Sequence, residues 1–306
     1  MPGRPWLPVH IKGSKMIFVS GANGQFAGGV IATLLAAGKA DQLVVGTRNV
    51  DSTFARELAG KGVTVRAADF RQPEQMRLAL QGVTKALLIP TYDTNDVRLQ
   101  QNLNALQAAK DAGVGHVVYA SFLHAESPVV EHSRLVHFPT EQAIRASGLG
   151  FTLLRHALYA DILVGDLADT LGSGMLHRPS GSARSAYIAR SDLGISAAHI
   201  LMRDEPSGKT YTETMERTYN GEEVAAIMSQ VWSKPIRFVP VDPTDWPRYM
   251  TEKWGVPPEI SKSTVGTMQA VAAGVFDLAT QDYAGITGRP PRDMRAFLEG
   301  VRDGRR

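Results

Sequence analysis

The residues whose types and spacing most directly indicate chemistry form the glycine-rich segment GANGQFA, residues 21–27. Its spacing is that of a dinucleotide-binding loop, in which Gly21 makes a tight turn, Gly24 admits a diphosphate and Ala27 lets a helix pack closely. The diphosphate would lie against backbone N–H groups at the positive end of that helix. Glycine also serves ordinary turns, so the prediction depends on the apolar stretches before and after the loop. The phosphate-binding residues predicted in this way are Gly21, Ala22, Asn23, Gly24, Gln25 and Phe26.

The next apolar stretch ends in Thr47, Arg48 and Asn49, and this end predicts which dinucleotide binds. A site that prefers NAD has Asp or Glu at this position, where the carboxylate accepts hydrogen bonds from the ribose hydroxyls. The guanidinium of Arg48 would instead attract the additional phosphate of NADP and offer it two parallel donors. A surface arginine that only ends a strand is the alternative. We expect NADPH as the cofactor.

The ends of the two following apolar stretches supply further candidates. Asp69 and Phe70 are placed to flank an adenine, through a hydrogen bond and an apolar contact. Pro90 and Thr91 are expected to line the site near the centre of the cofactor, with Tyr92 toward a substrate. These assignments rest on the rule that ligands of open α/β sheets bind outside the carboxyl ends of the strands. Each residue also fits an ordinary loop without a ligand.

To hold these residues together, the chain needs parallel strands joined by helices, and its pattern predicts them. From residue 16 to about residue 155, short apolar runs alternate with amphipathic stretches, which is typical of βαβ units. The predicted fold class is α/β, a Rossmann-type doubly wound parallel sheet with a smaller C-terminal substrate lobe. The expected strands are residues 16–19, 43–47, 63–67, 85–89, 116–119 and 151–154.

Two helices between these strands are predicted from apolar spacing. After the glycine loop, apolar residues recur at helical spacing until Gly38 ends the helix. Within residues 95–113, the predicted buried stripe consists of Leu99, Leu103 and Leu106.

The chain divides into three parts in this interpretation. Residues 1–15 are an extension before the domain, and residues 16–155 form the NADP-binding Rossmann domain. Beyond about residue 155 the alternation weakens and segments rich in turn residues appear. Residues 156–306 are therefore expected to form mostly the substrate lobe, partly interleaved with the sheet.

Composition limits the partners and the compartment. The 306 residues carry a net charge of +3, and the densest basic cluster is the terminal VRDGRR, which is typical of a solvated tail. We therefore expect a small-molecule substrate and no nucleic acid. The absence of cysteine excludes disulfides, thiolate metal sites and cysteine nucleophiles, and it fits a reducing, cytoplasmic location. The first 15 residues lack the apolar run of a signal peptide or membrane span, so we expect no membrane association. The oligomeric state stays open, a homodimer included.

Several segments resemble the NmrA-like, atypical short-chain dehydrogenase/reductase family, and within it the bacterial quinone oxidoreductase 2 and triphenylmethane reductase group. They include VSGANGQFAGGVI, TRN, GVTVRAADF, AAKDAGVGHVVYAS and ITGRPP, and HFPTEQAIRASGLGFTLLRHALY is the more specific match to the reductase group. The resemblance extends from Met16 to the C-terminus. It implies an NADPH-bound Rossmann domain with a small C-terminal lobe, and hydride transfer to a flat, conjugated, electron-poor substrate.

The same resemblance shows where the catalytic pattern departs from the usual one. Ordinary short-chain dehydrogenases pair a tyrosine with a lysine four residues later, and the lysine lowers the tyrosine pKa so that a proton can pass to a carbonyl. The corresponding residues here are His137 and Glu141, which disfavours an ordinary carbonyl reductase. A triarylmethyl cation accepts hydride without an acid. A quinone also needs protons, which water or a histidine supplies near neutral pH.

The catalytic candidates are His137, as proton donor or substrate-orienting group, and Tyr159, beside the nicotinamide. The alternatives are that His137 only hydrogen-bonds a loop and that Tyr159 is a core residue. Ser121 stands at the family's catalytic serine position and is expected to contact the cofactor. The expected substrate contacts are Tyr92, Phe122 and His137.

No metal is predicted. The histidines do not show metal-ligand spacing, and Pro139 argues against a helical pair of His137 and Glu141.

Three functions fit these observations. The favoured one is an NADPH-dependent reductase of quinones, triarylmethane dyes or similar conjugated acceptors. An NADP(H)-binding redox sensor that regulates a partner without turnover fits the missing tyrosine–lysine pair equally well. A reductase of an activated C=C or C=N bond is the third, because the loops that choose a substrate have no readable code.

Overall fold

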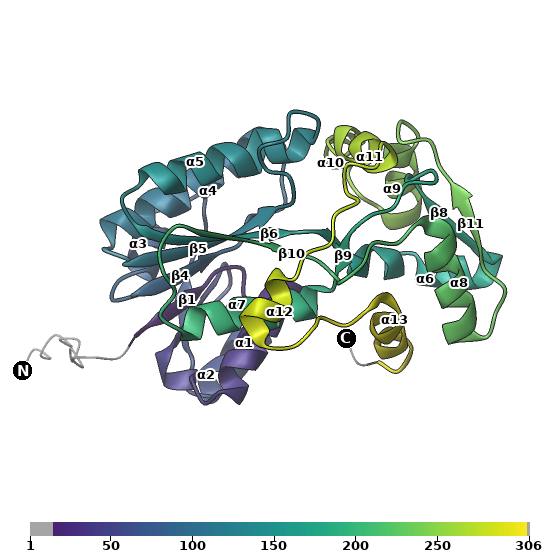
Figure 1. Cartoon of the computed structure of the whole chain (residues 1–306). Coiled ribbons are helices and arrows are strands. Elements are labelled where there is room, and N and C mark those ends of the chain that lie inside the picture. Colours follow the sequence, from purple (N-terminus) through teal and green to yellow (C-terminus); the bar gives the residue numbers. More distant parts are fainter. Residues whose placement is uncertain (1–14, 305–306) are drawn as a thin grey trace, which may run out of the picture.

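Seven parallel strands form the centre of the computed structural model, which describes residues 15–304 (Figure 1). Their order across the sheet is β3-β2-β1-β4-β5-β6-β10, so the first six follow the doubly wound order in which the chain reverses direction between β1 and β4. The predicted fold class and all six predicted strands are confirmed. The strands are β1 (Ile17–Val19), β2 (Leu43–Thr47), β3 (Thr64–Ala67), β4 (Lys85–Leu88), β5 (His116–Phe122), β6 (Gly150–His156) and β10 (Lys209–Glu213).

Strand β10 was not predicted, because its sequence lacks an apolar run. It reads KTYTE and lies at the edge of the sheet, where it pairs with β6 from Lys209 beside Thr152 to Glu213 beside His156. Only Glu213 among its residues is fully buried. The strand comes from the second half of the chain, so the sheet is completed by residues far from the glycine loop.

Helices cover both faces of the sheet (Figure 1). One face carries α3 (Pro73–Ala79), α4 (Asn95–Asp111) and α5 (Phe138–Ala146), and the other carries α1 (Gln25–Ala36), α2 (Thr53–Gly60) and α7 (Arg190–Met202). Each face has its own core of buried apolar side chains, and the core under α1 and α7 continues into the C-terminal lobe. A short 3-10 turn, η1 (Ala40–Gln42), leads from α1 to β2.

Helices α1 and α7 pack backbone against backbone at two glycines. A Cβ atom added to Gly194 would lie 2.7 Å from the Cα of Gly29, which is closer than any side chain can approach. This close contact fixes the helix that follows the glycine loop against a helix from the second half of the chain.

The predicted stripe of α4 is wrong in two of its three positions. Leu106 is buried, but Leu99 and Leu103 are only half-buried. The helix approaches the sheet through small and polar side chains instead, and these buried residues are Gln101, Asn102, Ala105, Leu106, Ala108 and Ala109. The small side chains let the helix lie close to the strands, and the two amides reach polar groups at the site.

The C-terminal lobe combines short strands with helices at one end of the sheet (Figure 1). Helix α12 (Asp282–Thr287) returns to pack on α7 and β10. The division at residue 155 stays a prediction, and two later elements lie with the sheet: β10 at its edge and α7 on one of its faces. The lobe strands are the pairs β7 (Leu158–Tyr159) with β9 (Tyr187–Ile188) and β8 (Met175–Arg178) with β11 (Arg237–Pro240). The lobe helices are η3 (Ala160–Val164), α6 (Leu167–Ser173), α8 (Gly221–Trp232), α9 (Trp246–Trp254), α10 (Pro258–Lys262), α11 (Val265–Ala272) and α13 (Met294–Arg302).

Of the predicted extension 1–15, residues 1–14 lie outside the described residues. Within residues 15–304, no helix has both the length and the apolar character needed to cross a membrane.

Candidate functional site

A cavity of about 560 Å³ lies at the carboxyl ends of β1, β2, β3 and β4. This is the point where the chain reverses direction between β1 and β4, the usual ligand position of such sheets. The structure brings together ten of the predicted site residues on its wall: Gly21, Ala22, Asn23, Gly24, Arg48, Asp69, Phe70, Pro90, Thr91 and Tyr92. Lining residues that sequence analysis did not assign to the site are Ser20, Gly46, Thr47, Asn49, Ala68, Arg71, Ile89, Asp93 and Gln101.

The glycine loop has the geometry of an anion cradle. Gly21 has φ of +64°, in the left-handed region that favours glycine. A Cβ atom on Gly24 would lie 3.3 Å from the Gly21 carbonyl oxygen, which the Gly24 N–H already contacts at 2.9 Å. Helix α1 then begins at Gln25 with no side-chain cap and no acidic residue in its first turn, as far as the described chain shows. The positive end of α1 therefore faces the cavity without a protein anion beside it.

Strand β2 forms the adjoining wall. The Thr47 hydroxyl donates to Asn23 Oδ1 at 3.2 Å, which ties the glycine loop to the end of β2. Arg48 is exposed, and within residues 15–304 it has no carboxylate at ion-pair distance. A free guanidinium on this wall fits the additional phosphate of NADP, as the sequence predicts.

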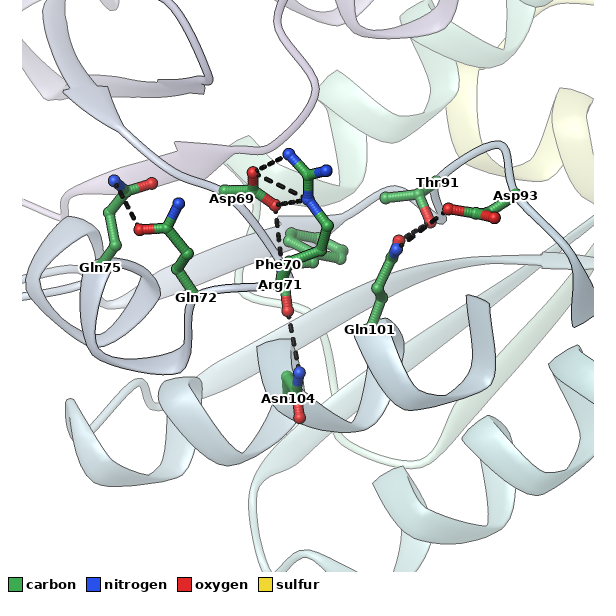
Figure 2. Close-up of polar contacts among 9 residues, drawn as sticks. All are labelled: Asp69, Phe70, Arg71, Gln72, Gln75, Thr91, Asp93, Gln101 and Asn104. Atoms are coloured by element: carbon green, nitrogen blue, oxygen red, sulfur yellow. Dashed lines mark hydrogen bonds and ion pairs between the residues drawn. The ribbon is translucent and has the colours of Figure 1, made fainter. Parts of the chain in front are cut away.

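The wall at the end of β3 contains a second arginine that is already paired (Figure 2). Arg71 donates to Asp69 through Nε, at 3.0 Å from Oδ1, and through Nη2, at 2.5 Å from Oδ2. Hydrogen bonding from Arg71 lowers the pKa of the buried Asp69 carboxyl, so Asp69 stays ionised. Asp69 thus lines the cavity as predicted, but its charge is offset by Arg71, and Arg48 is left as the free cation of the two.

Amide side chains of α4 form hydrogen bonds with the loops that follow β3 and β4 (Figure 2). The Gln101 amide bonds Thr91 through its oxygen and donates to Asp93 Oδ2 at 3.4 Å, while Asn104 donates to the Phe70 carbonyl at 3.0 Å. The predicted substrate contact Tyr92 follows on the same loop. Its side chain is 69% exposed, so it forms the rim of the cavity.

His137 is buried, and both of its ring nitrogens have partners inside the protein. Nδ1 lies 3.1 Å from the Tyr119 hydroxyl and Nε2 lies 3.2 Å from Nε2 of His132. The Phe122 ring stacks on His137 at 6.0 Å between centroids. Burial lowers the pKa of His137 well below its usual value, so the ring is neutral at pH 7. The imidazolium form expected near neutral pH does not fit this environment.

The prediction that Pro139 separates His137 from Glu141 is wrong. A π-helical turn (Ser133–His137) runs directly into α5, and Pro139 lies in the first turn of α5. Proline is tolerated there because a residue in the first turn of an α-helix does not donate its N–H to that helix. Among residues 15–304 there is still no group of three or more His, Asp or Glu side chains placed to hold a metal ion.

Glu141, at the usual lysine position, is the centre of a buried ion pair. Arg155 donates to its carboxylate at 3.0 and 2.7 Å, and the Ser121 hydroxyl donates to it at 2.6 Å. Glu141 is 1% exposed and Ser121 is 2% exposed. The structure therefore does not bring Ser121 to the cavity, because its hydroxyl is committed to Glu141.

Tyr159 lies at the end of β7 and is not among the residues that line the cavity. Its hydroxyl is 3.4 Å from His156 Nδ1, and the Arg190 guanidinium lies 4.4 Å above its ring. The remaining two predicted cofactor residues join this group: Gln25 accepts from Arg190 at 3.1 Å, and Phe26 packs edge-on against His156. These contacts connect Tyr159 to the start of α1.

Comparison with known proteins identifies the family to which the chain belongs. Residues 13–273 match the model of the NmrA-like family. The chain belongs to the NmrA-like family. The predicted resemblance to this family is thus confirmed.

Three proteins similar to this chain are reductases. Quinone oxidoreductase 2 of Escherichia coli is 30% identical over 266 residues, which are 86% of this chain and 90% of that protein. NAD(P)H azoreductase of Xenophilus azovorans is 27% identical over 291 residues, 93% of this chain and 97% of that protein. The structure of Citrobacter sp. triphenylmethane reductase complexed with NADP(H) superimposes with a TM-score of 0.84 at 33% identity, covering 93% of this chain and 99% of that one.

Proposed function

We propose that this NmrA-like protein is an NADPH-dependent oxidoreductase that transfers hydride to a planar conjugated electrophile, with a quinone as the first candidate. The observation that carries the proposal is the cavity at the chain reversal, which combines a glycine cradle, an uncapped helix end and the free guanidinium of Arg48. The similar proteins support it, since they are reductases and one of them is solved with NADP(H).

The residues present fit NADPH, which supplies the hydride when it is bound. When NADPH is bound, the backbone of residues 21–24 would hold the diphosphate and Arg48 would bind the additional phosphate. Phe70 and Asp69 would flank the adenine, and Pro90 and Thr91 would face the middle of the cofactor. What the chain contributes to rate is orientation of the two reactants and exclusion of water.

For the proton that a quinone requires, Tyr159 is a better candidate than His137. Both nitrogens of His137 are engaged by Tyr119 and His132, whereas the Tyr159 hydroxyl has one partner at 3.4 Å. The charge of Arg190 over the Tyr159 ring favours the tyrosinate, which offsets part of the pKa rise caused by burial. His137 then orients the substrate through its contact with Phe122.

The test is oxidation of NADPH, followed by absorbance, with neutral quinones, azo compounds, triarylmethane dyes and activated enones as acceptors. We expect turnover with quinones and a lower rate with NADH. Oxidation with enones alone would move the assignment to C=C reduction. Tight NADPH binding without turnover of any acceptor would refute the enzyme proposal and favour the redox sensor.

A further inference from the structure

Arg98 is placed beside the residues predicted to contact the substrate. Its N–H donates to the Thr94 carbonyl at 2.9 Å, so it lies in the first turn of α4, directly after the cavity rim formed by Tyr92. Its Nη1 atom lies 2.8 Å from Nε2 of His132. His132 in turn contacts the rings of His137 and Phe122, at 5.0 and 6.0 Å between centroids. Arg98 thus lies between the loop that carries the rim residue Tyr92 and an aromatic group formed by Phe122, His132 and His137, which lies beyond the residues that line the cavity.

The hydrogen bonds around Arg98 assign both neighbouring histidines to neutral forms. Arg98 donates to His132 Nε2, and the other nitrogen of His132 lies 3.1 Å from Asn95 Oδ1, an acceptor. His132 Nε2 also lies 3.2 Å from His137 Nε2, which acts as the donor when Tyr119 donates to the other nitrogen of His137. Burial and the charge of Arg98 lower the pKa of His132 to about 3, in agreement with this assignment. The guanidinium is the one charge in this network.

No carboxylate neutralises that charge at ion-pair distance within residues 15–304. Other arginines of the molecule are paired, as Arg155 is with Glu141 and Arg178 with Asp166. The acid next to Arg98 on the rim is Asp93, whose carboxylate oxygens instead accept from the Thr94 N–H and from Gln101. The Nε atom of Arg98 is buried and has no hydrogen-bond partner. A desolvated cation with an unused donor is unfavourable in a folded protein unless a ligand satisfies it.

We propose that Arg98 is the substrate-binding cation of this site and restricts the acceptors to neutral or anionic conjugated compounds with an oxygen beside the ring. The inference rests on the proposed function and names its substrate class. Quinones and their carboxylated or sulfonated derivatives fit, because their oxygens can accept from a guanidinium that no carboxylate neutralises within residues 15–304. Cationic triarylmethane dyes do not fit, because they would place a second positive charge beside the guanidinium.

The chemistry gives Arg98 a further role in the reaction. A quinone that accepts a hydride gains two electrons and one proton from the reduced nicotinamide, which is oxidised, and the quinone becomes a quinolate anion. One proton from water or Tyr159 completes the quinol. The charge of Arg98 stabilises the oxygen on which the negative charge develops, so its contribution is larger in the transition state than in the bound quinone.

The experiment compares three acceptors of similar aromatic character and different charge: 1,4-naphthoquinone, 1,2-naphthoquinone-4-sulfonate and the cationic dye malachite green. The variants are Arg98→Gln, which keeps one donor to His132, and Arg98→Lys, which keeps the charge. Arg134→Gln is the matched control, since Arg134 is exposed and its loss changes the net charge equally. NADPH affinity is measured for each variant, to show that the cofactor site and the fold are intact.

We expect Arg98→Gln to lower kcat/KM for the sulfonate by about ten-fold or more, and for the neutral quinone by less. Turnover of malachite green should be low in the wild type and should rise relative to the quinones in Arg98→Gln. Arg98→Lys should keep most of the preference for the sulfonate. Equal effects on all three acceptors, or the same changes in Arg134→Gln, would overturn the proposal.

A binding measurement separates this inference from the proposed function. Equilibrium dialysis of the naphthoquinone sulfonate against the wild type and Arg98→Gln, both with NADP present, does not depend on turnover. Weaker binding to Arg98→Gln supports the role of Arg98 even if no acceptor is reduced, in which case the enzyme proposal alone has failed. Equal binding to both proteins refutes the role of Arg98.

Discussion

The contact between α1 and α7 predicts that alanine substitutions at its glycines lower both the thermal stability and the affinity for NADPH, each to a different degree. In Gly194→Ala, the new Cβ atom would lie 2.7 Å from the Cα and carbonyl carbon of Gly29 and 2.8 Å from the nitrogen of Val30. All three are backbone atoms, so no side chain can rotate away. The two helices must separate by several tenths of an ångström to reach an ordinary contact distance.

The size of the effect follows from two opposing terms. Overpacking of this kind destabilises a protein by about 1–3 kcal/mol. Alanine is a better helix former than glycine by up to about 1 kcal/mol, which offsets part of that loss. We expect a net loss of about 1–2 kcal/mol for Gly194→Ala, hence a fall in Tm of roughly 2–8 °C at about 2–4 °C per kcal/mol. Since α1 carries the glycine loop at its start, NADPH binding should weaken as well.

Two neighbouring glycines provide the controls. A Cβ atom on Gly28 meets nothing within 4 Å, so Gly28→Ala should leave the Tm unchanged or raise it. A Cβ atom on Gly29 would lie 3.3 Å from the Gly194 Cα, so Gly29→Ala should fall between the other two. Thermal unfolding by circular dichroism and NADPH titration by fluorescence measure both effects. The reasoning is refuted if Gly194→Ala matches Gly28→Ala in Tm and in NADPH affinity.

Three further perturbations test other parts of the structure. Glu141→Gln leaves Arg155 with the exposed Glu126, at 2.6 Å, as its carboxylate partner, so urea unfolding should show a loss of about 1–3 kcal/mol. An unchanged midpoint would show that the pair is not structural. Arg48→Ala should lower the preference for NADPH over NADH, measured as the ratio of the two kcat/KM values, by about five- to ten-fold. The reason is that an exposed charge-assisted contact contributes about 1 kcal/mol. An unchanged ratio would contradict the assignment of Arg48. Burial lowers the pKa of His116 to about 4, so its neutral form stabilises the fold above pH 6.5, and that stability is lost as the pH falls toward 4. Unfolding at a series of pH values should show a shallower loss in His116→Gln than in the wild type, and identical profiles would exclude His116 as a cause.

The cofactor site was predictable because its signals are local. Each of its main residues follows a strand directly, and parallel strands bring their carboxyl ends to one edge of the sheet. The glycine loop and Arg48 could therefore be placed from short segments alone. The pairing of Arg71 with Asp69 also had a local signal, opposite charges two residues apart, which the sequence analysis did not use.

The residues that were missed depend on contacts between distant segments. Strand β10 has few apolar residues and is held at the sheet edge by its pairing with β6, so periodicity gives no sign of it. The roles of Glu141 and Arg155 depend on two different elements meeting in space. Arg98 is one arginine among many in the sequence, and only the fold shows that it contacts His132 and that no carboxylate of residues 15–304 lies at ion-pair distance from it.

The packing of α1 against α7 also has a consequence for the order of events during synthesis. Gly29 leaves the ribosome 165 residues before Gly194, which takes roughly 8–33 s at the usual rates of translation. Throughout that interval α1 lacks the helix that packs on it, so the nascent chain exposes the face of α1 that α7 covers in the folded protein. The cofactor site can therefore mature only late in synthesis, and a chain that stops before α7 would present an apolar surface suited to chaperones or to aggregation.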